Sequence, residues 1–271
     1  MKKKVAIWGA GPSGMMAAHA VSEMGHEIKI YDKDPDMTRR NAGVFYLHSD
    51  CNLGLEPIRI KHRVLGGIHF SDADLASAYG AKVYGDPMLK KNSIVGARRI
   101  AEVTGYNAQQ AVSRLWDIYG DFVEREEIRN FDRDYSLFSQ EHDLIVSTIP
   151  AYALFPDADL KATSTWIGIG EAPSEENFIL YDINPQIPWY RCSAIAGVFV
   201  MEFGKNYVPK LPSELKYQQV TKVMSDVSPL KKFPNLLFTG RFGAWDKTIL
   251  THNVYFNVLD WLFEMEQTSD G

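Results

Sequence analysis

The glycine-rich segment near the start of the chain constrains the fold more than any other feature of the sequence. Residues 5–20 read VAIWGAGPSGMMAAHA, and the apolar run Val5–Trp8 predicts a short strand. Three glycines with the spacing Gly-x-Gly-x-x-Gly follow at once: Gly9, Gly11 and Gly14. Residues 15–24 can continue as a helix that Gly25 ends as a left-handed cap, and Glu27–Tyr31 predicts a second strand. Strand, turn, helix and strand in this order predict an α/β protein with a parallel sheet.

Each glycine of the turn has a separate physical task in such a unit. Gly9 permits the tight turn, Gly11 lets a pyrophosphate approach the backbone, and Gly14 lets helix and strand pack closely. The helix N-terminus would direct N–H groups and a partial positive charge at the diphosphate. Asp32 follows at close to the spacing at which an acid accepts hydrogen bonds from a ribose diol, which argues against an adenosine 2′-phosphate, although Lys33 weakens that argument. The predicted dinucleotide contacts are the turn, the first helical residues and the end of the second strand: Gly9, Gly11, Pro12, Ser13, Gly14, Asp32 and Lys33.

The same segment has a second interpretation as a secretory signal peptide, because three lysines precede an apolar stretch that ends Ala18-His19-Ala20. A signal peptide needs an uninterrupted apolar core, and Gly9–Gly14 would break a helix in its middle. The dinucleotide-binding turn accounts for more of the residues. We therefore expect a dinucleotide-binding turn at this position and a cytoplasmic protein.

The composition is that of an ordinary globular chain. Of 271 residues, 45% are hydrophobic and 23% are charged, so one large or two modest domains can form a substantial core. The net charge of -5 does not indicate nucleic-acid binding, and no apolar run is long enough to span a bilayer. Cys51 and Cys192 form no zinc-binding pattern and are expected to be reduced, partly buried thiols. Two Asp-x-Asp pairs are expected to be solvated turns and not metal sites: Asp132 with Asp134, and Asp157 with Asp159.

Helical patterns recur along the rest of the chain. The stretch after Asp32 is expected to be loop-rich as far as Asp50, and a helical region follows. Within it, one apolar face before Gly120 predicts a helix: Ala111, Val112, Leu115, Trp116 and Tyr119. A further helix is expected to start at residues 212–213. Its apolar positions are Leu215, Val220, Val223 and Val227.

Strand-like runs are expected at residues 143–148, 178–181, 194–203 and 236–239. A loop over residues 240–247 and a helix over residues 251–266 follow the last of them. The chain therefore leaves the nucleotide-binding domain and returns to it. The predicted nucleotide-binding domain comprises residues 1–50, 105–150 and 230–271, and the predicted substrate-side domain comprises residues 51–104 and 151–229.

Three segments spread over the chain resemble successive FAD-contacting segments of one flavoprotein group. They are VAIWGAGPSG with Asp32, HDLIVSTIP at residues 142–150 and NLLFTGRFGAW at residues 235–245. The group contains UDP-galactopyranose mutase, protoporphyrinogen oxidase and the flavin amine oxidases, and GRFGAWDK is more similar to the mutase branch. The resemblance implies FAD as the cofactor, and an α/β fold with a Rossmann-like FAD-binding domain and a smaller inserted substrate domain.

The resemblance also implies roles for residues near the end of the chain. Gly240 and Arg241 would lie beside the FAD diphosphate, where the guanidinium would form bidentate hydrogen bonds. The last helix would direct its N-terminus at the flavin. The backbone N–H groups near Thr251, His252 and Asn253 would then stabilise negative charge on the reduced ring.

Two stretches are similar to segments near the substrate in the mutase branch. Residues 42–50, AGVFYLHSD, resemble a segment in which glycine is followed by two histidines near the isoalloxazine, but Phe45 replaces the first histidine. His48 becomes the candidate for catalytic proton transfer. Residues 187–195, IPWYRCSAI, resemble a strand whose arginine would make Arg191 the group that holds an anionic substrate. The plainer alternatives are a structural histidine at His48 and a surface ion pair at Arg191.

The predicted function is that of an FAD-dependent oxidoreductase-type flavoenzyme, amine oxidase-like or mutase-like, acting on a small polar substrate at flavin N5. Net redox chemistry is favoured because Phe45 removes a polar group expected near N5. Three alternatives stay open: a UDP-galactopyranose-mutase-like enzyme that uses reduced FAD without net redox, an NAD-dependent reductase, and a non-catalytic nucleotide-binding protein. We expect a small-molecule substrate and no membrane contact, and a homodimer is compatible with the sequence.

Overall fold

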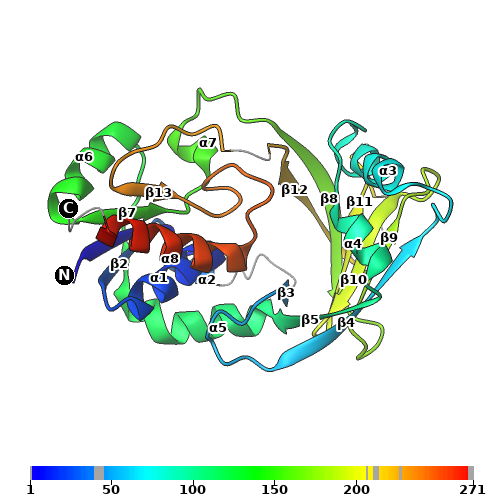
Figure 1. The fold of residues 1–271 in the computed structure, drawn as a ribbon, viewed down its shortest axis with the longest axis horizontal. Coiled ribbons are helices and arrows are strands. Elements are labelled where there is room, and N and C mark those ends of the chain that lie inside the picture. Colours follow the sequence, from blue (N-terminus) through cyan, green and yellow to red (C-terminus); the bar gives the residue numbers. More distant parts are fainter. Residues whose placement is uncertain (1, 40–45, 206, 210–213, 226–227, 268–271) are drawn as a thin grey trace. The chain divides into compact units, whose positions relative to one another are not determined.

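The structure is a computed structural model, and it describes residues 2–39, 46–205, 207–209, 214–225 and 228–267. The chain divides into two compact units, each made of segments that are distant in sequence (Figure 1). Unit 1 comprises Met1–Leu55, Ala108–Lys161 and Ser225–Gly271. Unit 2 comprises Glu56–Asn107 and Ala162–Met224.

Unit 1 contains a parallel sheet in the order β13-β7-β1-β2-β6. Its strands are β1 (Lys4–Trp8), β2 (Glu27–Asp32), β6 (Val123–Arg125), β7 (Leu144–Ser147) and β13 (Leu236–Phe238). The last four residues of β1 are buried, as expected for a central strand that is covered on both faces. This sheet confirms the predicted α/β, Rossmann-like fold. It also brings the carboxyl ends of all its strands to one edge, where folds of this kind bind ligands.

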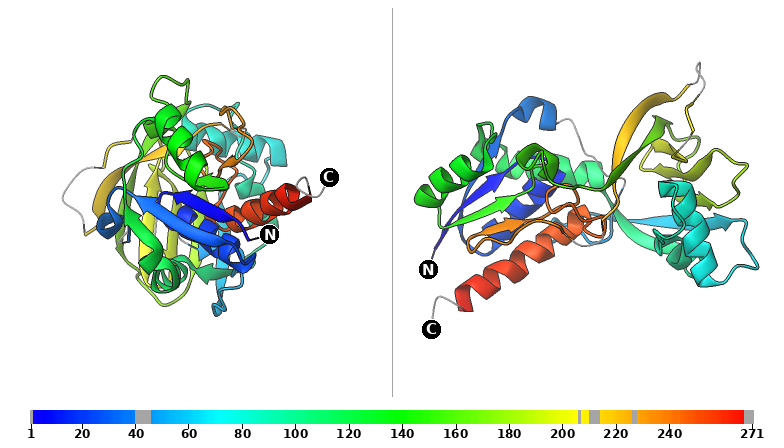
Figure 2. Two further views of the ribbon diagram at one scale, coloured as in Figure 1. Left: turned by 90° about the vertical axis from the view of Figure 1, so that its left-hand side faces the viewer. Right: turned by 90° about the horizontal axis from the view of Figure 1, so that it is seen from above.

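Helices cover the two faces of this sheet, with α6 and α8 on opposite sides (Figure 2). The elements are α1 (Pro12–Glu23), α2 (Pro35–Arg39), α5 (Ala108–Tyr119), α6 (Phe131–Glu141), α7 (Ala151–Leu154) and α8 (Thr251–Gln267), with a 3-10 turn at Gly120–Phe122 and a short strand β3 (Tyr46–Leu47). α1 packs against α5 and α8. α6 packs Phe131 and Phe138 against Trp8, with ring centroids 6.4 and 5.4 Å from the indole. Within the described ranges, no helix is both long enough and apolar enough to cross a membrane.

Unit 2 is built on a curled sheet that contains the order β12-β8-β11-β10-β9-β4-β5 (Figure 1). Its strands are β4 (Pro57–Leu65), β5 (Glu102–Asn107), β8 (Ala162–Glu171), β9 (Phe178–Asp182), β10 (Trp189–Ile195), β11 (Val198–Phe203) and β12 (Lys216–Val223). β4 and β9 run parallel, and the other neighbours are antiparallel. The helices are α3 (Asp72–Tyr84) and α4 (Ser93–Arg99). α3 packs on the sheet through Tyr79, whose ring meets Tyr181 and Tyr190 edge-on at 5.7 and 5.8 Å.

Two sequence predictions are wrong in unit 2. The segment expected to be a helix from residues 212–213 is the strand β12, which pairs antiparallel with β8 over Lys216–Val223, while 212–213 and Val227 lie outside the described residues. Tyrosine, valine and threonine are strand formers, and backbone pairing with β8 outweighs the helical spacing of the valines. The run 194–203 is also two strands, because Ala196–Gly197 forms a tight turn between β10 and β11.

Three expectations about less regular segments also need correction. The region after Asp50 contains the strands β4 and β5 as well as helices, and the loop-rich stretch before it contains α2. Asp132 and Asp134 lie in the first turn of α6 and do not form a solvated turn. The buried Asp134 carboxylate accepts hydrogen bonds from the backbone N–H groups of Arg129 and Asn130 at 2.9 and 3.0 Å, so it helps to start the helix.

Candidate functional site

The turn between β1 and α1 needs glycine at two positions for reasons of backbone geometry. Gly9 has a φ of +93°, and a Cβ there would lie 2.9 Å from Thr148 Oγ1. A Cβ on Gly14 would lie 1.7 Å from the carbonyl oxygen of Gly9, so only glycine lets the helix pack this close to the turn. The Gly9 N–H also donates to the Tyr31 carbonyl at 2.8 Å, which ties the turn to β2.

Gly11 differs from these two glycines, because its backbone is unstrained and its surroundings are open. Its φ of -64° and ψ of 177° suit any residue, and a Cβ placed there would meet nothing within 4 Å. α1 begins directly after it at Pro12, and no side chain caps the helix N-terminus. The helix therefore presents backbone N–H groups and the positive end of its dipole beside open space. Such an arrangement suits a phosphate group.

The Asp32 carboxylate lies at the end of β2 with 8% exposure and is bonded to the turn. Its Oδ2 accepts a hydrogen bond from the Ala10 N–H at 2.8 Å. Its Oδ1 accepts from the Asp34 N–H at 2.9 Å and from the Thr38 hydroxyl at 3.0 Å. A carboxylate has about four acceptor positions, so roughly one is left, on Oδ2. Asp32 can therefore accept one ribose hydroxyl, whereas Lys33 beside it is exposed.

A segment from near the end of the sequence packs against the start of α1. Gly240, two residues after β13, has a φ of +78°, and a Cβ there would lie 2.8 Å from Ser13 Oγ. The Thr239 N–H donates to the Ser147 carbonyl at 3.0 Å and continues the pairing of β13 with β7. Arg241 is partly buried and directly follows Gly240. The tertiary structure thus brings Gly240 and the backbone of Arg241 to the first turn of α1.

Tight packing holds the loop after Gly240 in place. A Cβ on Gly243 would lie 2.3 Å from the Thr239 carbonyl oxygen. Trp245 is 2% exposed, has a φ of +55°, and donates its indole N–H to the Lys161 carbonyl at 3.2 Å. A bulky residue in the left-handed region is strained, so the packing around the indole must fix this loop.

A side chain in the first turn of α8 binds the residue that precedes the helix. α8 begins at Thr251, and Asn253 Oδ1 accepts a hydrogen bond from the Leu250 N–H at 2.8 Å. The Asn253 N–H donates back to the Leu250 carbonyl at 3.0 Å. The first bond is one half of a capping box, so the carboxamide oxygen of Asn253 is engaged at the start of the helix. The Asn253 N–H is also engaged, whereas the sequence predicted that it would face the flavin.

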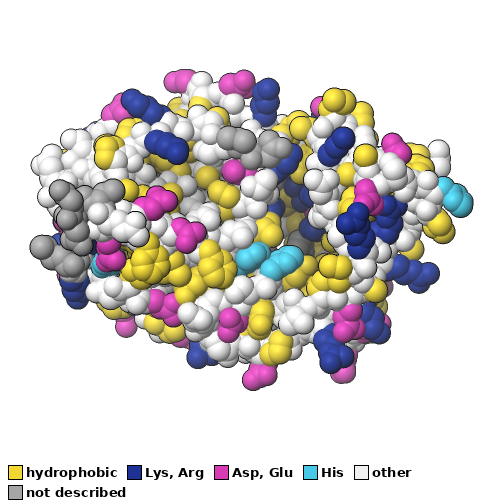
Figure 3. Space-filling view, viewed as in Figure 1, with side chains coloured by type: hydrophobic (Ala, Val, Ile, Leu, Met, Phe, Trp, Pro, Cys, Tyr) yellow, Lys and Arg dark blue, Asp and Glu magenta, His cyan; other side chains and the backbone are white. Residues whose placement is uncertain are grey.

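His48 and His252 lie side by side at the start of α8. Their ring centroids are 4.9 Å apart, and the Tyr46 ring stacks on His48 at 4.8 Å. Histidine side chains gather at the centre of the face shown in Figure 3. Burial and then the neighbouring His48 lower the pKa of His252 to about 4. The surrounding protein also lowers the pKa of His48 by partial desolvation, although this side chain is exposed at the surface. Both imidazoles are therefore neutral at neutral pH.

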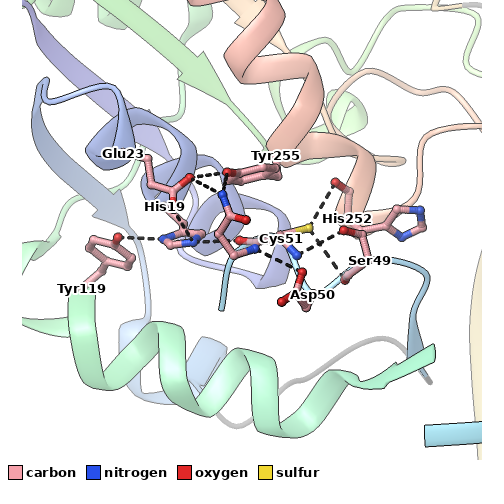
Figure 4. A network of polar contacts seen from close by, with 9 residues as sticks. His19, Glu23, Ser49, Asp50, Cys51, Tyr119, His252 and Tyr255 are labelled. Atoms are coloured by element: carbon pink, nitrogen blue, oxygen red, sulfur yellow. Dashed lines mark hydrogen bonds and ion pairs between the residues drawn. The ribbon is translucent and has the colours of Figure 1, made fainter. Parts of the chain in front are cut away.

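Polar side chains from three helices surround the turn that follows His48 (Figure 4). The turn consists of Cys51 and Asn52. The side chains come from α1, α5 and α8: His19, Glu23, Tyr119 and Tyr255. The members of this network are far apart along the chain, so sequence patterns gave almost no sign of it. The one local signal was the spacing of His19 and Glu23, four residues apart on one face of α1.

Arg191 belongs to unit 2, where it takes part in a buried ion cluster. Its guanidinium on β10 pairs with Glu202 on β11, which is 1% exposed. Lys222 Nζ lies 2.5 Å from the same carboxylate, and the Tyr190 hydroxyl donates to it at 2.6 Å. Burial opposes the charge of Arg191, but Glu202 holds its pKa above the ordinary value. The alternative expectation for Arg191 is a surface ion pair; the ion pair is present, but it is buried. The role of Arg191 in binding a substrate stays a prediction.

Both cysteines are free and more deeply buried than the sequence suggested, at 2% exposure for Cys51 and 4% for Cys192. Burial raises the pKa of Cys51 to about 11 and that of Cys192 to about 12, so both thiols stay protonated at neutral pH. In the described part of the chain, no three potential metal ligands of the types His, Cys, Asp and Glu come together.

Solved structures of low sequence identity share this fold. Reduced UDP-galactopyranose mutase is similar over 97% of this chain and 96% of its own, with a TM-score of 0.59 and 11% identity. The PF1083 protein from Pyrococcus furiosus is similar over 97% of both chains, with a TM-score of 0.60 and 13% identity. No protein-family model matches the chain, and no curated protein matches it in sequence. At such identities the likeness concerns the fold alone.

Proposed function

We propose that the chain is an FAD-dependent flavoenzyme of the oxidoreductase type, in which unit 1 holds the cofactor. The observation that carries the proposal is the open space beside Gly11, at the uncapped N-terminus of α1. A helix end that is left without a capping side chain needs another partner for its N–H groups, and a diphosphate is a suitable one.

The residues that would hold FAD come from three parts of unit 1. The backbone between Gly9 and Gly14 would contact the diphosphate, and the remaining acceptor position of Asp32 Oδ2 would bind a ribose hydroxyl. Arg241 directly follows Gly240, which lies against Ser13, and its guanidinium would add positive charge on the other side of the diphosphate. The bound flavin would supply a ring that accepts and returns electrons at N5.

The contact of Gly240 with Ser13 favours FAD over NAD. A small NAD-dependent reductase would need the first strand, turn and helix but has no evident use for this late segment. The resemblance of GRFGAWDK to flavoproteins and the fold shared with reduced UDP-galactopyranose mutase support the same choice. The fold likeness extends over nearly the whole chain and therefore includes unit 2.

His48 is the proposed proton-transfer group. Because the pKa of His48 is lowered, its imidazole is neutral at neutral pH and can accept a proton. Its neighbour His252 is also neutral, and a charge on either ring disfavours a charge on the other. The pair can therefore take up one proton more easily than two, which suits a single proton transfer to or from a small polar substrate.

The proposal is tested by placing a side chain in the open space at Gly11. Gly11→Val should fold normally, because the backbone there suits any residue and a Cβ meets nothing. It should weaken FAD binding at least about a hundredfold, because the valine would occupy the position of the diphosphate. Absorbance of flavin released from purified protein and calorimetric titration of the apoprotein with FAD measure the effect.

Gly96→Val is the matched control. Gly96 lies in α4 of unit 2 with a backbone that suits any residue, and a Cβ there also meets nothing within 4 Å. This variant should bind FAD like the parent. Equal flavin content in Gly11→Val and the parent would reject the site, and tight binding of NADH without binding of FAD would favour the reductase alternative.

A mutase-like reaction is the second candidate, because the fold is shared with reduced UDP-galactopyranose mutase. We favour net redox chemistry, since Phe45 stands where that branch has a histidine; this residue lies outside the described part of the structure. Incubation of the dithionite-reduced protein with a UDP-sugar separates the two. Isomerised sugar formed without consumption of reductant would establish the mutase reaction.

A further inference from the structure

His19 is a buried histidine that the proposed cofactor site does not use. It lies on α1 with 7% exposure, and its Nε2 is 2.9 Å from the Cys51 carbonyl oxygen. A carbonyl can only accept, so Nε2 carries the proton. Nδ1 lies 2.9 Å from the Tyr119 hydroxyl, a group that can donate to or accept from a ring nitrogen. Both ring nitrogens of His19 are therefore engaged, and Glu23 Oε1 lies 3.7 Å from Nε2.

Glu23 lies one helical turn after His19 on α1 and links the Cys51–Asn52 turn to α8. The Tyr255 hydroxyl of α8 donates to Glu23 Oε2, and Asn52 Nδ2 donates to the same oxygen at 3.2 Å. Asn52 Nδ2 also donates to the Tyr255 hydroxyl oxygen at 2.8 Å. Donors and acceptors match throughout, so α1 holds both the Cys51–Asn52 turn and α8 (Figure 4).

The Cys51–Asn52 turn needs such attachments, because its backbone is strained. Cys51 has a φ of +51° and Asn52 a φ of +59°. The left-handed conformation costs about 1 kcal/mol or more for a residue with a side chain, and somewhat less for asparagine. Two such residues in succession persist only where the surrounding structure fixes them.

The same turn contacts the neighbourhood of both histidines of the candidate site. The Cys51 N–H donates to Ser49 Oγ at 3.2 Å, next to His48 in the chain. The Cys51 thiol lies 3.8 Å from two carbonyl oxygens, those of Ser49 and His252, and can donate to either. A shift of the turn would therefore move the segment that carries His48 and release the backbone of His252.

We propose that His19 is a positioning residue that holds His48 against His252 by fixing the Cys51–Asn52 turn. The inference deepens the proposed function, because His48 is the proposed proton-transfer group. It predicts that the proton affinity of the histidine pair depends on a side chain of α1. The groups in contact with the pair are Tyr46, whose ring stacks on His48, and Cys51, whose thiol lies 3.8 Å from the His252 carbonyl oxygen. The charged groups Asp50 and Glu23 act on the neighbouring Cys51 and Tyr255.

The test is an NMR titration of the imidazole signals in the full-length protein without flavin. His19→Leu removes both ring nitrogens and leaves the turn attached to α1, among the described residues, only through the hydrogen bond from Asn52 to Glu23. The pKa of His252 should then rise from about 4 toward the ordinary value of 6.5, as the ring gains access to water and loses contact with His48. His26→Leu is the control, because His26 is a histidine of similar burial, 8% exposed, that faces Glu266 away from this turn.

Three results would overturn the proposal. The first is an unchanged pKa of His252 in folded His19→Leu, and the second is an equal rise in His26→Leu, which would indicate general loosening. If His19→Leu does not fold, Tyr119→Phe removes one hydroxyl and His19→Gln keeps a donor for the Cys51 carbonyl. Both should raise the pKa by less than His19→Leu would, and an unchanged pKa in both is the third overturning result.

The titration is independent of flavin, so the two proposals fail separately. A parent protein that binds no FAD would reject the proposed function. If the parent binds FAD and the pKa of His252 is the same in the parent and in His19→Leu, only the positioning role is rejected.

Discussion

His252 lies almost wholly out of water at the first turn of α8, and this burial decides its charge. Its pKa in the folded protein is about 4, against an ordinary value of 6.5 that the unfolded chain would show. The unfolded state therefore binds a proton more readily than the folded state between these two values. Stability from neutral His252 is fully present above pH 6.5 and is lost as the pH falls toward 4.

We therefore expect acid sensitivity that depends on this one residue. Between pH 7.5 and pH 5.0 the shift corresponds to about 2 kcal/mol of unfolding free energy, assuming a single site. Between these two pH values, His252→Asn should lose about 2 kcal/mol less unfolding free energy than the parent loses. Urea unfolding of both proteins at the two pH values measures it. Parallel losses in parent and variant would show that His252 titrates normally in the folded protein.

Among the elements, the β10–β11 hairpin has a local defect. Its turn residues Ala196 and Gly197 have φ values of +49° and +83°, which suit the tight turn with both central residues left-handed. Glycine adopts this conformation freely, whereas alanine does not. The Ala196 N–H donates to Asn177 Oδ1 at 2.8 Å, and that contact helps to hold the strained residue.

Ala196→Asn should stabilise the protein by about 0.5–1 kcal/mol, because asparagine tolerates the left-handed region and keeps the backbone N–H. Gly197→Ala should destabilise it by about 1–2 kcal/mol for conformational reasons alone, since a Cβ there meets nothing within 4 Å. Unfolding midpoints in urea check both. Equal midpoints for all three proteins would mean that the turn relaxes to another conformation.

At the scale of the whole molecule, each of the two units has its own buried core, and unit 2 also buries charge. Burial alone would raise the pKa of Glu202, but Arg191 and Lys222 hold it well below the ordinary value. The Glu202 carboxylate is 1% exposed and lies between two cations. Its removal should be strongly destabilising, because the two cations would then lack a negative partner.

Glu202→Gln should cost about 3–5 kcal/mol of stability, and the loss should appear first in unit 2. Hydrogen exchange should accelerate in β10, β11 and β12 before it does in β1 and β7. Glu176→Gln is the control in the same unit, because its ion pair with Lys61 is exposed and should contribute less than about 1 kcal/mol. Equal acceleration in all five strands would mean that the two units unfold together.

The sequence alone determined the first strand, turn and helix of unit 1, because these depend on neighbours in the chain. The left-handed Gly25 ends α1 where the pattern placed its end, and the predicted apolar face of α5 is buried. Local spacing is enough for such elements, since backbone conformation and helical periodicity act over a few residues. The parallel sheet followed from the same pattern.

Only the tertiary structure decided the rest, because partners far apart in the sequence supply it. β12 is a strand because β8 pairs with it, although its valines have helical spacing. His19 is fixed by the Tyr119 hydroxyl and the Cys51 carbonyl, which lie 100 and 32 residues away. Gly240 meets Ser13 from the other end of the chain. No local pattern encodes such pairings, because chain folding alone decides which donors and acceptors meet.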